Sequence, residues 1–250
     1  MFVDTHCHIY NEYYEDIDKL MEKVKNNNIK FIINNACNIK TAKEILELSN
    51  RFDNMFVVVG LHPEENLDEI DKMEEIIIYN VNNNKMVGIG EIGLDYYWNK
   101  ETKEEQKKVF IKQLELARKY NLPVIIHSRE STGDMLDILK NYKLKGIIHC
   151  FNGSVEVAKE YIKMGYKLGI NGVVTFKNCK LIDTLKIIGI DNIVFETDSP
   201  YLTPVPDRGK TNDPSYINKI AKFLSEELNV GLDKLAEISN NNVSEIFDIK

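Results

Sequence analysis

The chain has 250 residues, of which 43% are hydrophobic and 28% are charged, and these values are typical of a folded globular protein rather than a disordered one. Thirty-two basic and 39 acidic side chains give a formal net charge of −7, which argues against a protein that coats nucleic acid through a broad basic surface. An enzyme that binds one phosphate group at a small site is not excluded.

The first residues contain no basic segment followed by an apolar one, so we expect no signal peptide. No apolar run approaches the roughly 18 residues needed to span a membrane, so we expect no membrane association. The cysteines are scattered, with no CxxC pair, and this favours a reducing, cytoplasmic location. They are Cys7, Cys37, Cys150 and Cys179. Because no linker rich in Pro, Ser or Gly divides the chain, we expect one domain over residues 1–250.

Short apolar runs rich in β-branched residues predict strands. The runs are nearly continuous rather than alternating, which is typical of strands buried on both faces of a parallel sheet. In chain order they begin at residue 2 and then cover residues 29–34, 55–60, 85–90, 123–126, 145–148, 166–170 and 192–195.

Stretches of helix length lie between these runs. The clearest is 101–120, where Phe110, Leu114 and Ala117 share one face at a spacing of three and four residues. The other predicted helices are 13–26, one beginning near residue 41, 64–81, 132–142, 155–164, 179–187 and two within 213–247.

Two patterns predict where helices begin and end. Thr102 with Glu105, and Thr41 with Glu44, match the capping box that opens a helix. Asparagine tolerates left-handed geometry, so three asparagine clusters are interpreted as helix ends and turns. The clusters are residues 26–28, 82–84 and 240–242.

About eight strands alternating with about eight helices indicate an α/β protein with a parallel sheet and right-handed crossovers. An open doubly wound sheet and a closed (β/α)8 TIM barrel both fit this order. The number of units and the chain length favour the barrel.

Histidines follow the predicted strands directly. All five occupy such positions, and in a barrel these strand ends form the face that carries the active site. They are His6, His8, His62, His127 and His149.

Imidazole is a common ligand for divalent transition metals. His6 and His8 lie two apart on a strand, so both point the same way and can reach one metal. Cys7 points the opposite way, and this alternation opposes a mixed zinc site made of all three residues. Carboxylates follow the fourth and eighth strands as Glu91 and Asp198, where a bound metal would satisfy a buried charge. Asp95 is interpreted more simply, as a cap on a turn.

Residues 88–93 match the GxGxxG pattern of dinucleotide-binding enzymes. That pattern should open a helix, but Leu94 to Trp98 does not read as one. Glu91 would also set a negative charge against a pyrophosphate. We therefore reject this interpretation.

The ordered set of motifs resembles the TatD family of metal-dependent deoxyribonucleases, within the wider amidohydrolase-like group. Its motifs extend over nearly the whole chain. They are Asp4-Thr5-His6-Cys7-His8, Gly60-Leu61-His62-Pro63, Gly90-Glu91-Ile92-Gly93-Leu94-Asp95-Tyr96, His127-Ser128-Arg129-Glu130, His149-Cys150-Phe151-Asn152-Gly153, Glu196-Thr197-Asp198-Ser199-Pro200-Tyr201-Leu202 and the segment from Pro204 to Lys210.

The resemblance implies a TIM barrel with two divalent metal cations and a metal-activated water that hydrolyses phosphodiesters. It implies catalytic roles for Glu91 and Asp198, with Glu91 bridging the metals and Asp198 orienting the water. The implied metal ligands are His6, His8, Glu91, His127, His149 and Asp198. The implied substrate-binding residues are His62, Arg129, Asn152 and Arg208.

Three positions depart from the family pattern. Glu64 and Asp207 stand where the family often has histidine, and Thr211 stands where it commonly has a basic residue. These changes remove positive or proton-carrying groups near the rim, so we expect weaker attraction to long nucleic acid.

The expected activity is that of a deoxyribonuclease, an exonuclease that acts as a monomer on DNA or a small phosphoester. Zinc, manganese, magnesium or iron-like ions suit the ligand set. The alternative is a metal-dependent hydrolase of an acyl ester or amide, such as an aminoacyl ester. A non-catalytic metal-binding scaffold is a further alternative. Removal of Arg129 should distinguish the two enzymes, because a neutral substrate should barely respond.

Overall fold

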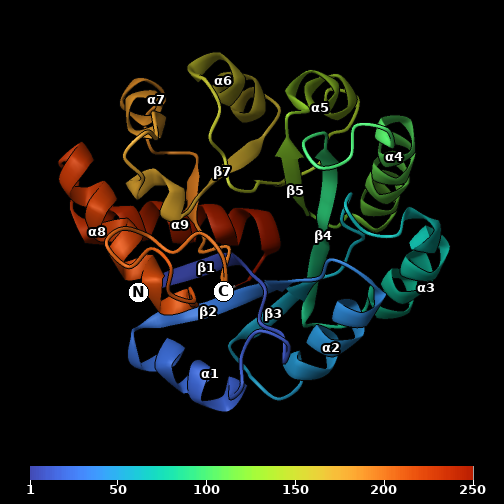
Figure 1. Cartoon of the computed structure of the whole chain (residues 1–250), viewed down its shortest axis with the longest axis horizontal. Coiled ribbons are helices and arrows are strands. Elements are labelled where there is room, and N and C mark those ends of the chain that lie inside the picture. Colours follow the sequence, from blue (N-terminus) through green and yellow to red (C-terminus); the bar gives the residue numbers. More distant parts are fainter. Residues whose placement is uncertain (250) are drawn as a thin grey trace.

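Eight parallel strands form the centre of the molecule, and helices surround them (Figure 1). The computed structural model describes residues 1–249, so Lys250, the last residue of the expected domain, lies outside the described residues. Neighbouring strands pair in chain order from β1 to β8. The strands are β1 (Phe2–Cys7), β2 (Ile29–Asn35), β3 (Met55–Val58), β4 (Met86–Asp95), β5 (Val124–Arg129), β6 (Gly146–Ile148), β7 (Tyr166–Ile170) and β8 (Ile193–Phe195).

The sheet closes where β1 meets the end of β8. An isolated parallel bridge joins Cys7 to Ser199. The backbone N–H of His8 donates to the carbonyl of Ser199 at 2.7 Å, and that of Asp198 donates to the carbonyl of His6 at 2.9 Å. The predicted closed barrel is therefore confirmed, and the alternative of an open doubly wound sheet is excluded. Its closure places the first and last predicted metal-binding motifs side by side.

The helices pack on the outside of the barrel in the order expected of β/α units (Figure 1). They are α1 (Ile17–Asn26), α2 (Ile39–Ser49), α3 (Ile70–Asn80), α4 (Lys103–Tyr120), α5 (Thr132–Leu139), α6 (Val155–Lys163), α7 (Leu181–Ile188), α8 (Ile217–Leu228) and α9 (Leu232–Phe247). The helix predicted over 64–81 is shorter, because a separate 3-10 turn at Leu67–Glu69 precedes α3. No helix within residues 1–249 is long and apolar enough to cross a membrane.

The predicted helix caps were partly wrong. In α2 the capping residue is Asn38, whose side chain accepts from the backbone N–H of Thr41, so Thr41 is the third helical residue rather than the cap. Thr102 does precede α4, but its side chain makes no capping bond and accepts instead from Gln106 Nε2 at 3.1 Å. In both cases a polar side chain other than the predicted cap, or a partner other than the helix backbone, takes the hydrogen bond.

The asparagine clusters were interpreted correctly at Asn27, which ends α1, and wrongly at residues 240–242, which lie inside α9. The amide of Asn242 donates to the carbonyls of Asp191 and Ile193 at 2.9 and 2.8 Å. These tertiary hydrogen bonds attach α9 to β8, and they outweigh the weak helix propensity of asparagine.

The barrel interior changes character along its axis. At the amino-terminal end of the strands it is apolar, and α9 covers it with Val243, Ile246 and Phe247. At the carboxyl-terminal end it contains buried histidines and carboxylates. β4 continues through the glycines of residues 88–93 without opening a helix, which agrees with the rejection of a dinucleotide site. The open, polar end is therefore where chemistry can occur.

Candidate metal centre

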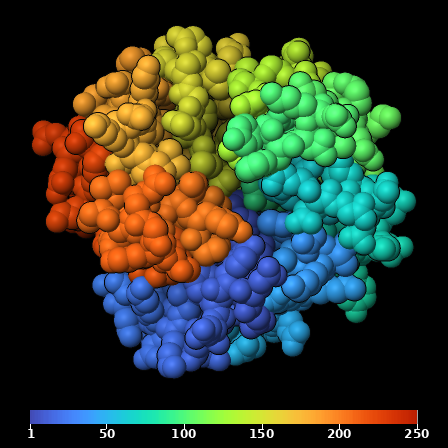
Figure 2. Space-filling view, viewed as in Figure 1, coloured from blue at the N-terminus to red at the C-terminus, as the bar shows by residue number. Residues whose placement is uncertain are grey.

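Histidines and carboxylates from six strands converge at this end of the barrel. They line a cavity of about 650 Å³, and Figure 2 shows the molecule hollowed near its middle, between the orange segment after β8 and the green and cyan segments. His6 lies beneath the cavity and is fully buried. The other members of the cluster line its wall: His8, His62, Glu91, Asp95, His127, His149 and Asp198.

Four nitrogen and oxygen atoms form a first group of metal size. The Nε2 atoms of His6 and His8 lie 3.1 Å apart. Glu91 Oε2 lies 3.4 Å from His6 Nε2 and 3.6 Å from His8 Nε2. Asp198 Oδ1 lies 3.4 Å from both nitrogens. A tetrahedral ion with bonds of about 2.0–2.1 Å keeps its ligand atoms about 3.3–3.4 Å apart, so these residues fit a divalent cation such as zinc.

A second group surrounds the other oxygen of Glu91. Glu91 Oε1 lies 3.0 Å from His127 Nδ1 and 3.6 Å from Nε2 of both His62 and His149. One carboxylate therefore turns one oxygen to each group. This is the arrangement expected of a ligand that bridges two ions.

The outer nitrogens of three histidines have partners that orient the rings. His8 Nδ1 lies 2.9 Å from the hydroxyl of Tyr10 and 3.2 Å from the carbonyl of Asn35. His127 Nε2 lies 2.9 Å from Asp95 Oδ2. A ring that donates its outer N–H to an acceptor turns a lone pair toward the site, which is the form that binds metal.

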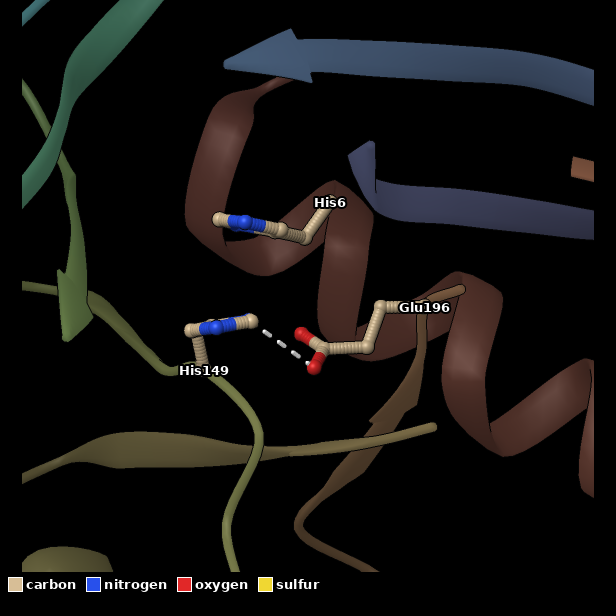
Figure 3. A group of neighbouring side chains, drawn as sticks. All are labelled: His6, His149 and Glu196. Carbon is tan, nitrogen blue, oxygen red and sulfur yellow. Dashed lines mark ion pairs between the residues drawn. The ribbon is translucent and has the colours of Figure 1, made fainter. Parts of the chain in front are cut away.

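Glu196 has the corresponding relation to His149. Its Oε1 lies 3.0 Å from His149 Nδ1, and Figure 3 shows this carboxylate beside the stacked rings of His149 and His6. The same oxygen accepts from the backbone N–H of Cys150 at 2.7 Å. Glu196 is fully buried just after β8, and its second oxygen, Oε2, makes no hydrogen bond.

His62 differs from the other histidines in its hydrogen bonding. The backbone N–H of Glu64 donates to His62 Nδ1 at 3.3 Å, so the neutral ring carries its proton on Nε2, the nitrogen that faces Glu91. Burial lowers the pKa of His62 to about 3, which keeps the ring neutral at physiological pH. In the metal-free protein His62 is therefore arranged as a hydrogen-bond donor toward Glu91, and its ring nitrogen also belongs to a possible ligand group with Glu91 and His127.

Strong coupling between opposite charges shifts the pKa values of the cluster. Burial alone would lower the pKa of His6, but Glu91 and Asp198 outweigh it and raise the pKa to about 10. His127 behaves in the same way, with Asp95 and Glu91 raising its pKa to about 9. Burial would raise the pKa of Glu91, but the histidines, His6 first, hold it well below its usual value. The cluster therefore favours positive charge among its carboxylates, as a cation site requires.

The predicted substrate-binding residues lie in different places. Arg129 is exposed at the rim, and its guanidinium lies 4.0 Å from the centre of the Tyr97 ring. Asn152 is exposed at the edge of a second cavity beside the metal centre. Arg208 lines neither of these two cavities among the described residues, and it stacks on Phe176 at 3.9 Å. The structure thus brings Arg129 and Asn152 to the site and leaves Arg208 outside it.

The sequence did not reveal the roles of Glu196 and Asp95. Asp95 does cap a turn, as expected, through its Oδ1 and the backbone N–H groups of Tyr97 and Trp98, while Oδ2 orients His127. Their positions in the sequence could have suggested these roles, because both acids lie close to predicted ligands at strand ends.

Asp207, which stands where the family often has histidine, forms ion pairs with Lys210 and Lys219 and lies outside the cluster.

Known proteins are similar to this chain over nearly its whole length. The family model described as "TatD related DNase" matches residues 3–248. The uncharacterized metal-dependent hydrolase YabD of Bacillus subtilis is 38% identical over 257 residues, covering 100% of both chains. The uncharacterized metal-dependent hydrolase YcfH of Escherichia coli K12 is 33% identical over 255 residues, covering 99% of this chain and 96% of YcfH.

Solved structures show the same fold. The TatD homologue YjjV of Escherichia coli K12 superposes with a TM-score of 0.91 at 26% identity, covering 100% of this chain and 98% of YjjV. A TatD family hydrolase from Entamoeba histolytica gives a TM-score of 0.85 at 25% identity, covering 98% of this chain and 97% of that one. With the family model matched over residues 3–248, the chain belongs to the TatD family of metal-dependent hydrolases.

Proposed function

We propose that the protein is a two-metal phosphodiesterase that shortens single-stranded DNA from an end. The position of Glu91 carries this proposal, because its two oxygens face two separate groups of histidines. Two divalent cations held there would activate a water molecule and neutralise a phosphodiester. The donor set of imidazoles and carboxylates suits zinc, manganese or iron-like ions, and magnesium is a further candidate.

The side chains around the cations have distinct roles in the proposal. Burial would raise the pKa of Asp198, but His149, His6 and His8 lower it below its usual value, so the carboxylate is ionised and can accept a proton. His62 donates a hydrogen bond from Nε2 to a substrate oxygen. Arg129 pairs with the phosphate charge from the rim. All these groups come from one chain, which is consistent with an active monomer.

The first experiment is hydrolysis of end-labelled single-stranded DNA by metal-loaded protein, with and without chelator. We expect stepwise shortening, and we expect chelator to abolish it. Asp198→Asn should lower kcat by about 100-fold or more, because a proton acceptor is lost. Asp137→Asn, an exposed carboxylate paired with Lys140, is the matched control and should leave the rate unchanged. Bound metal that supports no shortening by the unaltered protein would contradict the proposal.

A second experiment separates phosphodiester from acyl-ester hydrolysis. Arg129→Gln removes a charge at the rim and should reduce kcat/KM for a phosphodiester by about tenfold or more, while a neutral acyl ester should be hydrolysed at an unchanged rate. Arg118→Gln, a surface change on α4, is the control. Efficient acyl-ester hydrolysis with no phosphodiester hydrolysis would favour the alternative substrate class.

A further inference from the structure

A second cavity adjoins the metal centre, and the proposed chemistry does not yet assign an occupant to it. It has a volume of about 480 Å³, within the range of about 300–1,000 Å³ that holds small ligands. We call it the side pocket. Its walls come from the ends of β5 and β6, from α6 and from the loop after β8.

The side pocket and the main cavity share part of their walls. His127, Arg129, His149 and Asp198 line both. A phosphodiester held at the metal centre would therefore lie next to both cavities.

The walls of the side pocket away from the metal centre combine apolar and polar side chains. Phe151 is buried and meets the Tyr161 ring edge to face at 6.2 Å. Val157 and Leu202 are half-buried and line the same space. Ser128 and Tyr161 contribute hydroxyl groups. The exposed ions Arg129 and Glu130 lie at its edge, so the interior suits a flat, uncharged group with polar atoms on its edge.

From these features we infer that the side pocket binds the base of the terminal nucleotide, the one released by each cut. The inference rests on the proposed phosphodiesterase activity and adds a determinant of substrate recognition to it. Apolar and aromatic walls bind any base through its face, so the pocket gives little selectivity among bases. It does favour ends that carry a base over ends that lack one.

The test compares two single strands that differ only in their last nucleotide, which is ordinary in one and abasic in the other. The unaltered protein should shorten the ordinary end with a kcat/KM about tenfold higher, since the base contact is lost in the abasic end. Val157→Trp fills the side pocket and should bring this ratio close to one, mainly by slowing the ordinary end.

The matched control is Val155→Trp, two residues earlier on α6 and outside the walls of the side pocket. It should retain the tenfold preference. Val157→Phe provides a smaller obstruction in case the tryptophan prevents folding, and circular dichroism and metal content report whether each variant is intact.

The outcomes separate the two claims. A ratio near one in the unaltered protein, or a tenfold ratio that survives in folded Val157→Trp, overturns the side-pocket inference and leaves the phosphodiesterase proposal standing. Failure of the unaltered, metal-loaded protein to shorten either strand contradicts the phosphodiesterase proposal itself.

Discussion

Asp95 orients the His127 ring and, when the ring is neutral, favours the proton on Nε2, and this relation can be tested separately from the ligands themselves. In Asp95→Asn the amide oxygen can still cap Tyr97 and Trp98, but an N–H group then faces His127 Nε2 in place of an acceptor. The ring should lose the form that turns a lone pair toward Glu91. We expect metal affinity to fall by about 10–100-fold, measured by titrating zinc into protein from which a chelator has removed the metal.

Asp134→Asn is the control for this change, because Asp134 is a partly exposed carboxylate that accepts from the hydroxyl of Tyr96, and an amide oxygen can do the same. Equal zinc affinity in Asp95→Asn and the unaltered protein would show that Asp95 serves the turn alone.

The raised pKa values of His6 and His127 predict how the metal-free protein responds to pH. A histidine whose folded pKa lies above its unfolded value of 6.5 contributes stability that is complete below pH 6.5. That contribution is lost as pH rises through about 9 for His127 and about 10 for His6. Urea unfolding of the metal-free protein should therefore give a lower free energy of unfolding at pH 9.5 than at pH 6.5.

His127→Gln should reduce this dependence, since one of the two titrating rings is removed. A free energy of unfolding that does not change between pH 6.5 and 9.5 would contradict the charge coupling described for the cluster. His62 should not contribute in this window, because its pKa of about 3 affects stability only as pH falls below 6.5.

Much of the cluster could be predicted from the sequence, because ligand-type residues at the ends of parallel strands must meet at one end of a barrel. The orienting partners could not. Whether Glu196 faces His149, or Arg208 stacks on Phe176 instead of reaching the site, depends on side-chain directions that strand position alone does not determine. The roles assigned to the metal-ligating and substrate-binding residues remain predictions.

At the scale of the elements, Gly93 and Gly133 differ in whether the surrounding structure has room for a Cβ atom. Gly93 lies in β4 with a φ of +149°, and a Cβ atom there would lie 1.9 Å from the carbonyl oxygen of His127. Gly93→Ala should therefore displace β5, which carries His127, and reduce both stability and zinc affinity. Gly133 lies in α5, and an added Cβ there would meet no atom within 4 Å beyond its chain neighbours and its own helix backbone.

Gly133→Ala should leave zinc affinity unchanged and raise the free energy of unfolding by up to about 1 kcal/mol, because alanine favours helix. Thermal unfolding and zinc titration of the two variants measure the contrast. Similar effects of both substitutions would contradict the close approach of β4 and β5.

The positions of most elements follow from periodicity, and their limits depend on tertiary contacts. The helix predicted over 101–120 is observed at Lys103–Tyr120, where a strong apolar face determines the assignment. The two helices predicted within 213–247 are observed as α8 and α9, but the asparagines inside α9 were interpreted as a helix end because the bonds from Asn242 to the carbonyls of Asp191 and Ile193 are tertiary. No local pattern reports contacts with residues fifty positions away.

For the whole molecule, the closed end of the barrel should control stability without affecting the chemistry at the open end. Phe247 is 7% exposed and packs on the apolar interior, whereas Tyr79 on α3 is 88% exposed. Phe247→Ala should cost about 3–5 kcal/mol of unfolding free energy and Tyr79→Ala close to none. Zinc affinity of the folded Phe247→Ala protein should be unchanged, and a large loss of affinity would show that the two ends are coupled.

The closure of the barrel between β1 and β8, with α9 across its base, has a consequence for biosynthesis. Along the chain, Asp198 follows its partners His6 and His8 by almost two hundred positions, and α9 follows Asp198. The nascent chain therefore exposes two adjacent histidines without the acids that complete their cation site. The complete set of candidate ligands can therefore come together only after Asp198 has been synthesised, and α9, which covers the base of the barrel, is synthesised later still.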